Sequence, residues 1–273
     1  MNALGLSMIV KMGCICSRES ININGHKYMV KERLGEGGFS CVDLVENTTT
    51  KKKYALKRIT CHSIDDQKIA MQEINYYKKL RHPNIIELVD STFKGSADIV
   101  VQATSEAFLV LPYFKRGTLH DCLTLRSFNK NYIEIKEVLR IFNEICQALK
   151  FLHDFTPDPI AHRDLKTANV CLTENMEPVL MDLGSCAPAK VQICGAQDAQ
   201  KLQDIAAERS SMTYRAPELF HVESYCVIDQ RTDIWDVHEL VLFMLNVNPS
   251  ERPFIDDVIA KTGDLKNKID TIV

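Results

Sequence analysis

A charged loop between two apolar segments, from His162 to Asn169, carries the residues that group-transfer chemistry needs. Its eight residues, His-Arg-Asp-Leu-Lys-Thr-Ala-Asn, hold an acid, two basic residues and an amide. Such loops, held in place by a core, often carry function. Asp164 could accept a proton from a hydroxyl while the amide oxygen of Asn169 reaches a metal ion. For the first three residues alone a solvated turn is the simpler interpretation, so partners elsewhere in the chain must decide.

A glycine-rich turn upstream offers backbone groups to an anionic ligand. Glycines let backbone N–H groups approach phosphate oxygens because no side chain stands in the way. A hairpin also needs a glycine at its turn, so this signal is weak on its own. The residues of this turn and its flanks that could contact a nucleotide are Leu34, Gly35, Glu36, Gly37, Gly38, Phe39, Ser40 and Val42.

A carboxylate on an apolar helix face indicates a buried ion pair. The pattern predicts a helix over residues 64–80, with acidic residues at its start that suit the helix dipole. Glu73 falls on the apolar face of this helix, and an unpaired buried charge costs several kcal/mol or more. Lys57, at the end of a predicted strand, is its natural partner. The expected apolar positions of the helix are Ile69, Tyr76, Tyr77 and Leu80.

The elements that must position these residues form a sheet followed by helices. Runs rich in Tyr, Val, Ile and Leu, separated by turn residues, predict five strands and therefore a five-stranded sheet with one helix. A second helix is predicted from 135 to 152, where apolar residues follow helical spacing. It leads directly into the charged loop. The predicted strands cover residues 28–34, 41–46, 54–60, 85–93 and 108–111, and residues 179–181 form a short buried strand.

Bulk properties describe a globular chain with little net charge. It has 273 residues, 45% hydrophobic and 25% charged, with a net charge of −3, so general nucleic-acid binding is not indicated. Ten cysteines are scattered without zinc-ligand spacing, which favours reduced thiols in a cytoplasmic protein. No apolar run is long enough to span a bilayer, and the N-terminus is a poor signal peptide.

Taken together, the motifs resemble the eukaryotic protein kinases over residues 28–262. The loop at 162–169 matches H-R-D-L-x-x-x-N, and Lys57 ends a strand similar to V-A-I-K. Asp182-Leu183-Gly184 is a variant of D-F-G, and Ala216-Pro217-Glu218 matches A-P-E. Ser40 replaces the third glycine of the glycine-rich motif. Finer features resemble the lipid-modified Ser/Thr kinases of the Numb-associated kinase family, which are Golgi- and vesicle-associated.

The resemblance implies an α+β, bilobal fold and an ATP-dependent Ser/Thr protein kinase that autophosphorylates. Asp164 would deprotonate the substrate hydroxyl, and Lys166 would steady the γ-phosphate. Lys57, paired with Glu73, would position the α- and β-phosphates of ATP. Protein substrates follow from A-P-E, and Lys166 favours Ser/Thr over Tyr. The remaining implied roles are Mg²⁺ binding by Asn169 and Asp182, adenine contacts from Ala55, Leu111 and Tyr113, and phosphorylation at Ser210, Ser211, Thr213 or Tyr214.

Near the N-terminus, residues 12–17 match the N-myristoylation pattern M-G-x-x-x-S. If Met12 is the start, Gly13 would carry the myristoyl chain, and Cys14 and Cys16 are palmitoylation candidates. Two acyl chains are what make anchoring stable. The protein would then be cytoplasmic and peripheral on Golgi, vesicle or plasma membranes. A chance hexapeptide is the alternative, because eleven residues precede Met12.

The kinase pattern departs after Trp235. Asp233 resembles the family residue that anchors the catalytic loop, and Arg252 would pair with Glu218. These two landmarks stand only 252 − 233 = 19 positions apart, several dozen fewer than in intact family members, so we expect a truncated, weakly stable lower lobe. The alternative function is a catalytically impaired chain that binds nucleotide or partners. The expected division is an N-terminal segment (1–27), a small lobe (28–111), a large lobe (112–262, shortened near 235–237) and a tail (263–273).

Overall fold

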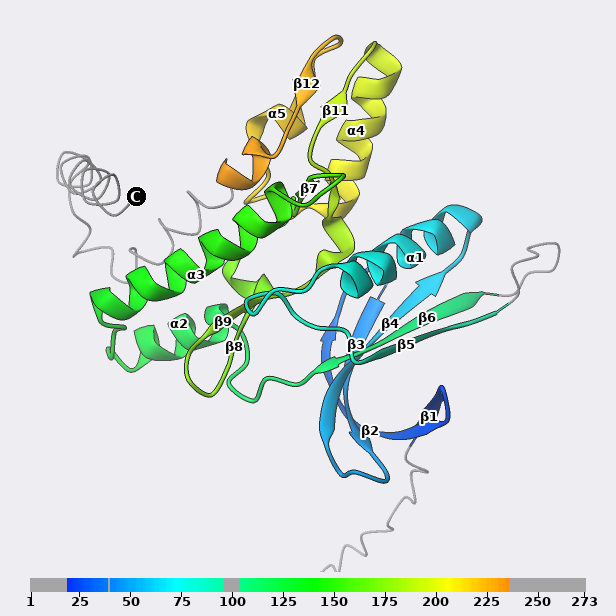
Figure 1. Ribbon diagram of the computed structural model, residues 1–273, viewed down its shortest axis with the longest axis vertical. Coiled ribbons are helices and arrows are strands. Elements are labelled where there is room, and N and C mark those ends of the chain that lie inside the picture. Colours follow the sequence, from blue (N-terminus) through cyan, green and yellow to red (C-terminus); the bar gives the residue numbers. More distant parts are fainter. Residues whose placement is uncertain (1–18, 39, 96–103, 236–273) are drawn as a thin grey trace, which may run out of the picture.

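The computed structural model describes residues 19–38, 40–95 and 104–235, which form a sheet lobe and a mainly helical lobe (Figure 1). The expected sites at Gly13, Cys14, Cys16, Phe39 and Arg252 lie outside the described residues, as does the chain after Trp235. The bilobal α+β fold is therefore the expected one in the described part of the chain.

The small lobe is an antiparallel sheet with the order β1-β2-β3-β4-β6-β5. It has six strands rather than the five predicted. The additional strand is β1, which precedes the first predicted strand and pairs with the start of β2. The strand predicted at 85–93 is also displaced: β5 begins at Asp90, while Ile85 and Ile86 are buried outside any strand. The strands are β1 (Ser20–Ile23), β2 (His26–Glu36), β3 (Ser40–Asn47), β4 (Lys53–Cys61), β5 (Asp90–Lys94) and β6 (Ser105–Pro112).

Helix α1 (Ile64–Lys79) crosses the small lobe and faces the large one (Figure 1). Ser63 caps its N-terminus: its hydroxyl accepts from the backbone N–H of Asp66, whose carboxylate accepts from the N–H of Ser63 in return. The buried residues of α1 are Ala70, Glu73, Ile74 and Tyr77. The buried face is thus rotated from the predicted one, since Ile69 and Tyr76 are only partly buried.

In the large lobe, α2 (Leu119–Phe128) and α3 (Ile135–His153) precede the charged loop. The far end of α3 is buried through Ile145, Leu149 and Leu152, as its apolar spacing predicts, whereas Ile135 in its first turn is 60% exposed. The short elements that follow are β7 (Ile160–Ala161), β8 (Val170–Leu172), β9 (Pro178–Leu180), β10 (Ala187–Pro188), β11 (Val191–Gln192) and β12 (Val227–Ile228), with 3₁₀ turns at 167–169 and 183–185.

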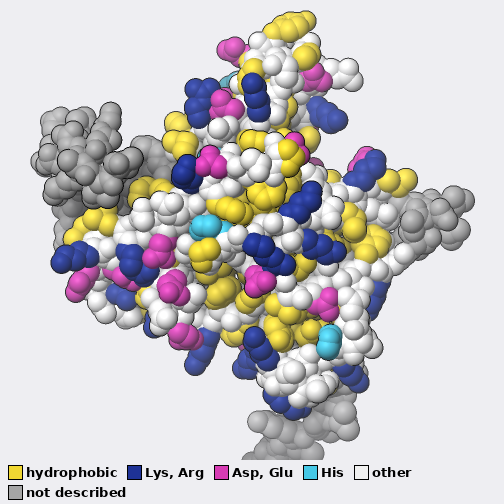
Figure 2. All heavy atoms as spheres, viewed as in Figure 1, with side chains coloured by type: hydrophobic (Ala, Val, Ile, Leu, Met, Phe, Trp, Pro, Cys, Tyr) yellow, Lys and Arg dark blue, Asp and Glu magenta, His cyan; other side chains and the backbone are white. Residues whose placement is uncertain are grey.

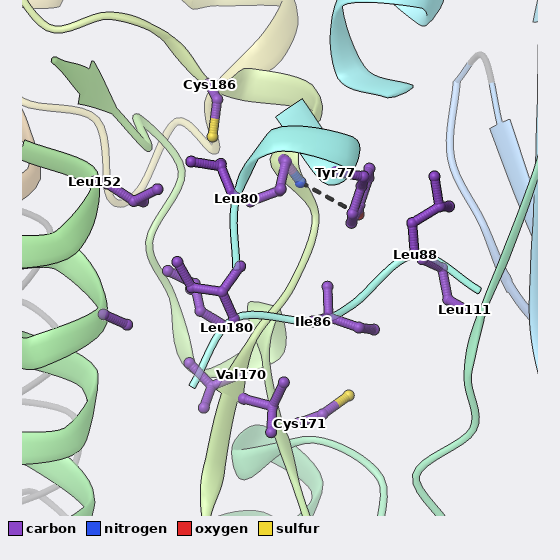
Figure 3. Close-up of a cluster of buried hydrophobic side chains, with 14 of the residues drawn as sticks. Tyr77, Leu80, Ile86, Leu88, Leu111, Leu152, Val170, Cys171, Leu180 and Cys186 are labelled. Atoms are coloured by element: carbon purple, nitrogen blue, oxygen red, sulfur yellow. Dashed lines mark hydrogen bonds between the residues drawn. The ribbon is translucent and has the colours of Figure 1, made fainter. Parts of the chain in front are cut away.

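One hydrophobic cluster joins the two lobes behind the charged loop (Figure 3). Tyr77 and Leu80 from the end of α1 lie beside Leu180 of β9, and Leu152 of α3 faces them. The Tyr77 hydroxyl accepts from the backbone N–H of Leu183 at 3.4 Å. Since this cluster contains residues from α1, α3 and β9, it fixes the orientation of α1 relative to the loop that it serves.

Candidate active site

An ion-pair triad joins the small lobe to the large one; the Glu73 side chain is buried, whereas that of Asp182 is 41% exposed. The Lys57 ammonium donates to Glu73 Oε1 at 2.7 Å and to Asp182 Oδ1 at 2.7 Å. Lys57 is on β4 and Glu73 on α1, as the helix pattern predicts, while Asp182 follows β9. Asp182 has φ 61°, the left-handed region, which turns its carboxylate toward the lysine. The triad therefore forms only when the two lobes hold β4, α1 and the segment after β9 close together.

The electrostatics of the triad favour the charged forms of Lys57 and Asp182. Burial lowers the pKa of Lys57, but the charges of Glu73 and Asp182 outweigh burial and hold this pKa well above its usual value. The charge of Lys57 lowers the pKa of Asp182 to about 2. Burial raises the pKa of Glu73, and Lys57 offsets part of that rise. Asp182 is therefore an anion at neutral pH.

The charged loop brings two expected residues, Lys166 and Asn169, onto the carboxylate of a third, Asp164. Asp164 Oδ2 accepts from the Lys166 ammonium at 2.9 Å and from the Asn169 amide at 2.9 Å. Asp164 Oδ1 accepts the backbone N–H of Ser211 at 2.8 Å, and the Ser211 hydroxyl lies 2.6 Å from the Lys166 nitrogen. Asp164 is only 6% exposed. Its orientation is thus fixed from its own loop and from the segment around Ser211.

Asp233 holds this loop from below. It is fully buried, and its two oxygens accept the backbone N–H groups of His162 at 2.8 Å and Arg163 at 2.7 Å. His153 of α3 lies 2.8 Å from the same carboxylate. Arg163 has φ 63°, an unfavourable conformation for a residue with a side chain. The carboxylate of Asp233 offsets part of that strain by accepting the N–H of Arg163 itself and the N–H of the residue before it.

Strand register places the expected nucleotide-contacting residues beside the triad. Val42 of β3 stands opposite Gly35 of β2 on one side and Lys57 of β4 on the other. The turn between β2 and β3 is closed by the Gly37 N–H donating to the Ser40 carbonyl at 2.7 Å. A cavity of about 200 Å³ touches Gly38, Lys57 and Glu73, but it extends along β4 and α1 past Ile59 and Ile69, and none of the residues expected at adenine lines it. A phosphate chain between the glycine-rich turn and the triad would meet backbone amides on one side and Lys57 on the other.

The other expected contacts lie along the strands that lead to the segment joining the lobes. Ala55 of β4 pairs with Leu111 of β6, the last buried residue before that segment. Tyr113 is partly buried just beyond it, and Leu34 of β2 is 42% exposed. Glu36 is exposed at the end of β2. An aromatic base between Leu34 and Ala55 would lie next to the backbone after Leu111, where adenine is expected.

The donor groups suit a metal that is completed by phosphate oxygens. Among the described residues no group of three or more His, Cys, Asp or Glu side chains could hold a metal by itself. Asn169 commits its amide nitrogen to Asp164, at 2.8 Å to the carbonyl and 2.9 Å to the carboxylate, so its amide oxygen remains available as a ligand. Asp182 adds an anionic oxygen. Mg²⁺ takes few protein ligands together with phosphates and water, so these two residues fit it.

Two features of the site were missed in the sequence. The first is α4 (Ala196–Arg209), a helix within the segment from Asp182 to Glu218; its Ala199, Leu202 and Ala206 have helical spacing and are buried. The second is Ser211, expected only as a phosphorylation site, which bonds Asp164 and Lys166 instead. Ser210 is buried and donates to the Ala206 carbonyl. Glu218 lies in α5 (Pro217–Phe220), while its expected partner is outside the described residues.

Comparison with known proteins agrees with this geometry. A family profile described as "Protein kinase domain" matches residues 28–261. "Serine/threonine-protein kinase 16" from Rattus norvegicus is 41% identical over 251 residues, covering 92% of this chain and 78% of the relative, and its Homo sapiens counterpart is 40% identical over the same coverage. "Serine/threonine-protein kinase ppk13" from Schizosaccharomyces pombe is 30% identical, covering 84% and 75%. The chain therefore belongs to the protein kinase family and is a serine/threonine protein kinase.

Proposed function

We propose that this kinase performs Mg²⁺-dependent phosphoryl transfer with the residues that the geometry brings together. Asp164 accepts the proton of the substrate hydroxyl, and Lys166 neutralises charge on the transferred phosphoryl group. Lys57, held by Glu73, positions the other phosphates. Mg²⁺, held by Asn169 and Asp182, supplies charge neutralisation when bound. The observation that carries this proposal is the Lys57 ammonium, 2.7 Å from both Glu73 and Asp182.

The metal assignment is tested by nucleotide binding. Calorimetric titration of ATP with Mg²⁺ and with EDTA should show tighter binding with the metal. In Asp182→Asn that difference should shrink, because a neutral amide is a weaker ligand for a hard cation than a carboxylate. If Mg²⁺ tightened ATP binding equally in the variant and in the native chain, Asp182 would not be a metal ligand.

Autophosphorylation is also proposed, with Thr213 as the favoured site in the activation segment. Of the four hydroxyl residues expected there, Ser210 and Ser211 are occupied by hydrogen bonds. Tyr214 is partly buried, whereas Thr213 is exposed. Mass spectrometry of the chain after incubation with ATP should find phosphate on Thr213 and less of it in Thr213→Val. Phosphate confined to Ser211 would contradict this choice.

A membrane role through an acylated N-terminus is the third part of the proposal. The motif at Gly13, Cys14 and Cys16, together with the resemblance to the Numb-associated kinases, supports peripheral attachment and a function in membrane trafficking. No helix among the described residues is long and apolar enough to cross a bilayer. In cells, a chain started at Met12 should incorporate an alkyne-tagged myristate. The same chain with Gly13→Ala, or one started at Met1, should not.

The short spacing from Asp233 to Arg252, 252 − 233 = 19 positions, favours a second candidate function. If the lower lobe is too short to support turnover, the chain binds nucleotide without transferring phosphate. A melting temperature raised by ATP together with no phosphate transfer would favour this nucleotide-binding role. Transfer that Asp164→Asn abolishes would exclude it.

A further inference from the structure

Five lysines form a contiguous basic face at one end of the small lobe, made by Lys27, Lys31, Lys51, Lys52 and Lys53. Two turns meet there: the N–H of Thr48 donates to the Lys27 carbonyl at 2.9 Å, and the N–H of Asn47 donates to the Lys52 carbonyl at 2.9 Å. Figure 2 shows Lys and Arg side chains gathered at the lower end of the molecule, where the sheet ends in Figure 1. The face is thus assembled from β2 and the β3–β4 turn.

Strand geometry places Lys27 and Lys53 on one face of the sheet. Side chains alternate across a strand, and Tyr28 between the two lysines of β2 is 2% exposed. Lys27 therefore projects from the surface opposite to the core, and Lys31, at an irregularity in the β2–β3 register, lies on the same face through its ion pair with Glu46. Lys53 stands beside Glu46 of β3, which in turn stands beside Met29 of β2. The five lysines are all exposed.

The basic face has a charge opposite in sign to that of the whole chain. Residues 20–31 and 46–54 contain five lysines and one acid, Glu46, so their net charge is 5 − 1 = +4, whereas the chain carries −3. Within the described residues Lys31 forms an ion pair with Glu46 at 3.2 Å, and none of the other four lysines has a carboxylate at that distance. Lys52 lies 5.5 Å above the ring of Tyr54. Most of this charge is available to an external partner.

We propose that the basic face binds the anionic lipid headgroups of a membrane surface. Lysines are flexible, strongly hydrated point charges, which suit a laterally mobile layer of headgroups and lack the fork with which arginine reads phosphates and bases. Each basic residue near such a surface strengthens attraction to it, and the attraction fades within a Debye length. A membrane partner also agrees with the position of the basic face, which lies beside the point where the N-terminal segment enters the fold.

The chain enters the fold beside this face. The Glu19 carbonyl accepts from the N–H of Val30, next to Lys31, and the Glu19 carboxylate lies 2.8 Å from Arg58. The acylation motif ends at Ser17, two positions before Glu19. One acyl chain needs a second signal for stable attachment, and a polybasic surface is such a signal. This link rests on the proposed acylation, whereas the charge argument does not.

The test uses the full, unacylated chain, so that the basic face alone is measured. Sedimentation with vesicles of phosphatidylcholine containing roughly 30% phosphatidylserine should show binding at low salt that is lost at high salt and absent with phosphatidylcholine alone. The triple change Lys51→Ala, Lys52→Ala and Lys53→Ala should weaken binding about a hundredfold, given the contribution of each lysine near an anionic surface.

A matched control separates position from net charge. Lys78→Ala, Lys79→Ala and Lys136→Ala removes the same charge from exposed sites on α1 and α3 and should leave vesicle binding within about twofold. ATP binding should be unchanged in both triple variants, since none of the six lysines is among the residues expected to contact the nucleotide. Equal losses in the two variants, or no preference for anionic vesicles, would overturn the proposal. Equally tight binding to duplex DNA, lost in the first variant, would assign the face to nucleic acid instead. Acylation is measured separately by myristate labelling, so either proposal can fail alone.

Discussion

Replacing Asp233 by asparagine should uncouple the catalytic loop from its support. The native carboxylate accepts two backbone N–H groups, at 2.8 and 2.7 Å, and lies 2.8 Å from His153. An asparagine keeps one acceptor oxygen but turns an NH₂ group toward the other N–H donor. One charge-assisted hydrogen bond is lost and a buried donor is left without an acceptor.

The magnitude follows from these contacts. Hydrogen bonds to a charged group contribute about 1.5–3 kcal/mol, and an unsatisfied buried donor costs about 1–3 kcal/mol. Arg163, with φ 63°, also loses part of what holds it in a strained conformation. We expect Asp233→Asn to lower the free energy of unfolding by about 3–5 kcal/mol. This is a large share of the stability of an ordinary domain, about 5–15 kcal/mol.

Urea unfolding of the full chain, with kcat measured below the transition, checks this prediction. Asp229→Asn is the control, because Asp229 forms a surface pair with Arg231 at 2.9 Å and such pairs contribute about 1 kcal/mol or less. We expect a large loss of stability and of kcat in Asp233→Asn and little change in Asp229→Asn. If Asp233→Asn unfolds within about 1 kcal/mol of the native chain and keeps its kcat, Asp233 does not hold the loop.

Three further changes test the site. Glu73→Gln should raise the KM for ATP and lower kcat, because Lys57 then keeps only Asp182 as an anionic partner. Steady-state kinetics with varied ATP concentration measure both constants, and unchanged values would mean that the Lys57–Glu73 pair is unimportant. Ser211→Ala should lower kcat by about tenfold, since it removes a hydrogen bond of about 1.5 kcal/mol to Lys166, with ATP affinity unaffected. Gly184→Ala should weaken ATP binding in calorimetry, because an added Cβ would lie 3.0 Å from Glu73 Oε2; native affinity would mean that the carboxylate moves at no cost.

The sequence predicted the contacts that follow from local periodicity. The Lys57–Glu73 pair followed from the phase of one helix and the need of a buried carboxylate for a partner. The sixth strand could have been found as well: Asn24-Gly25 between apolar runs is a strong hairpin signal, and the two residues have φ 47° and 85°. The strand predicted at 85–93 exists as β5 but was started five residues too early, because a short apolar run indicates burial without specifying the type of element.

Other features depend on the tertiary structure. The bond from Ser211 to Lys166 joins residues 45 positions apart through a segment that contains a helix, and no spacing rule connects them. The support from Asp233 was expected from family resemblance, whereas the participation of His153 needed the position of α3. Helix α4 had a readable pattern in Ala199, Leu202 and Ala206, but no helix was predicted between the two landmark motifs that flank it.

The most direct test of the whole account is phosphate transfer by the full chain. The native protein should transfer labelled phosphate from ATP to serine or threonine of a generic protein substrate. Asp164→Asn should reduce this transfer by about 10²–10⁴-fold, the contribution of a positioned base, while leaving ATP binding intact. Transfer at the native rate by Asp164→Asn would contradict the assignment of the catalytic loop on which the account rests.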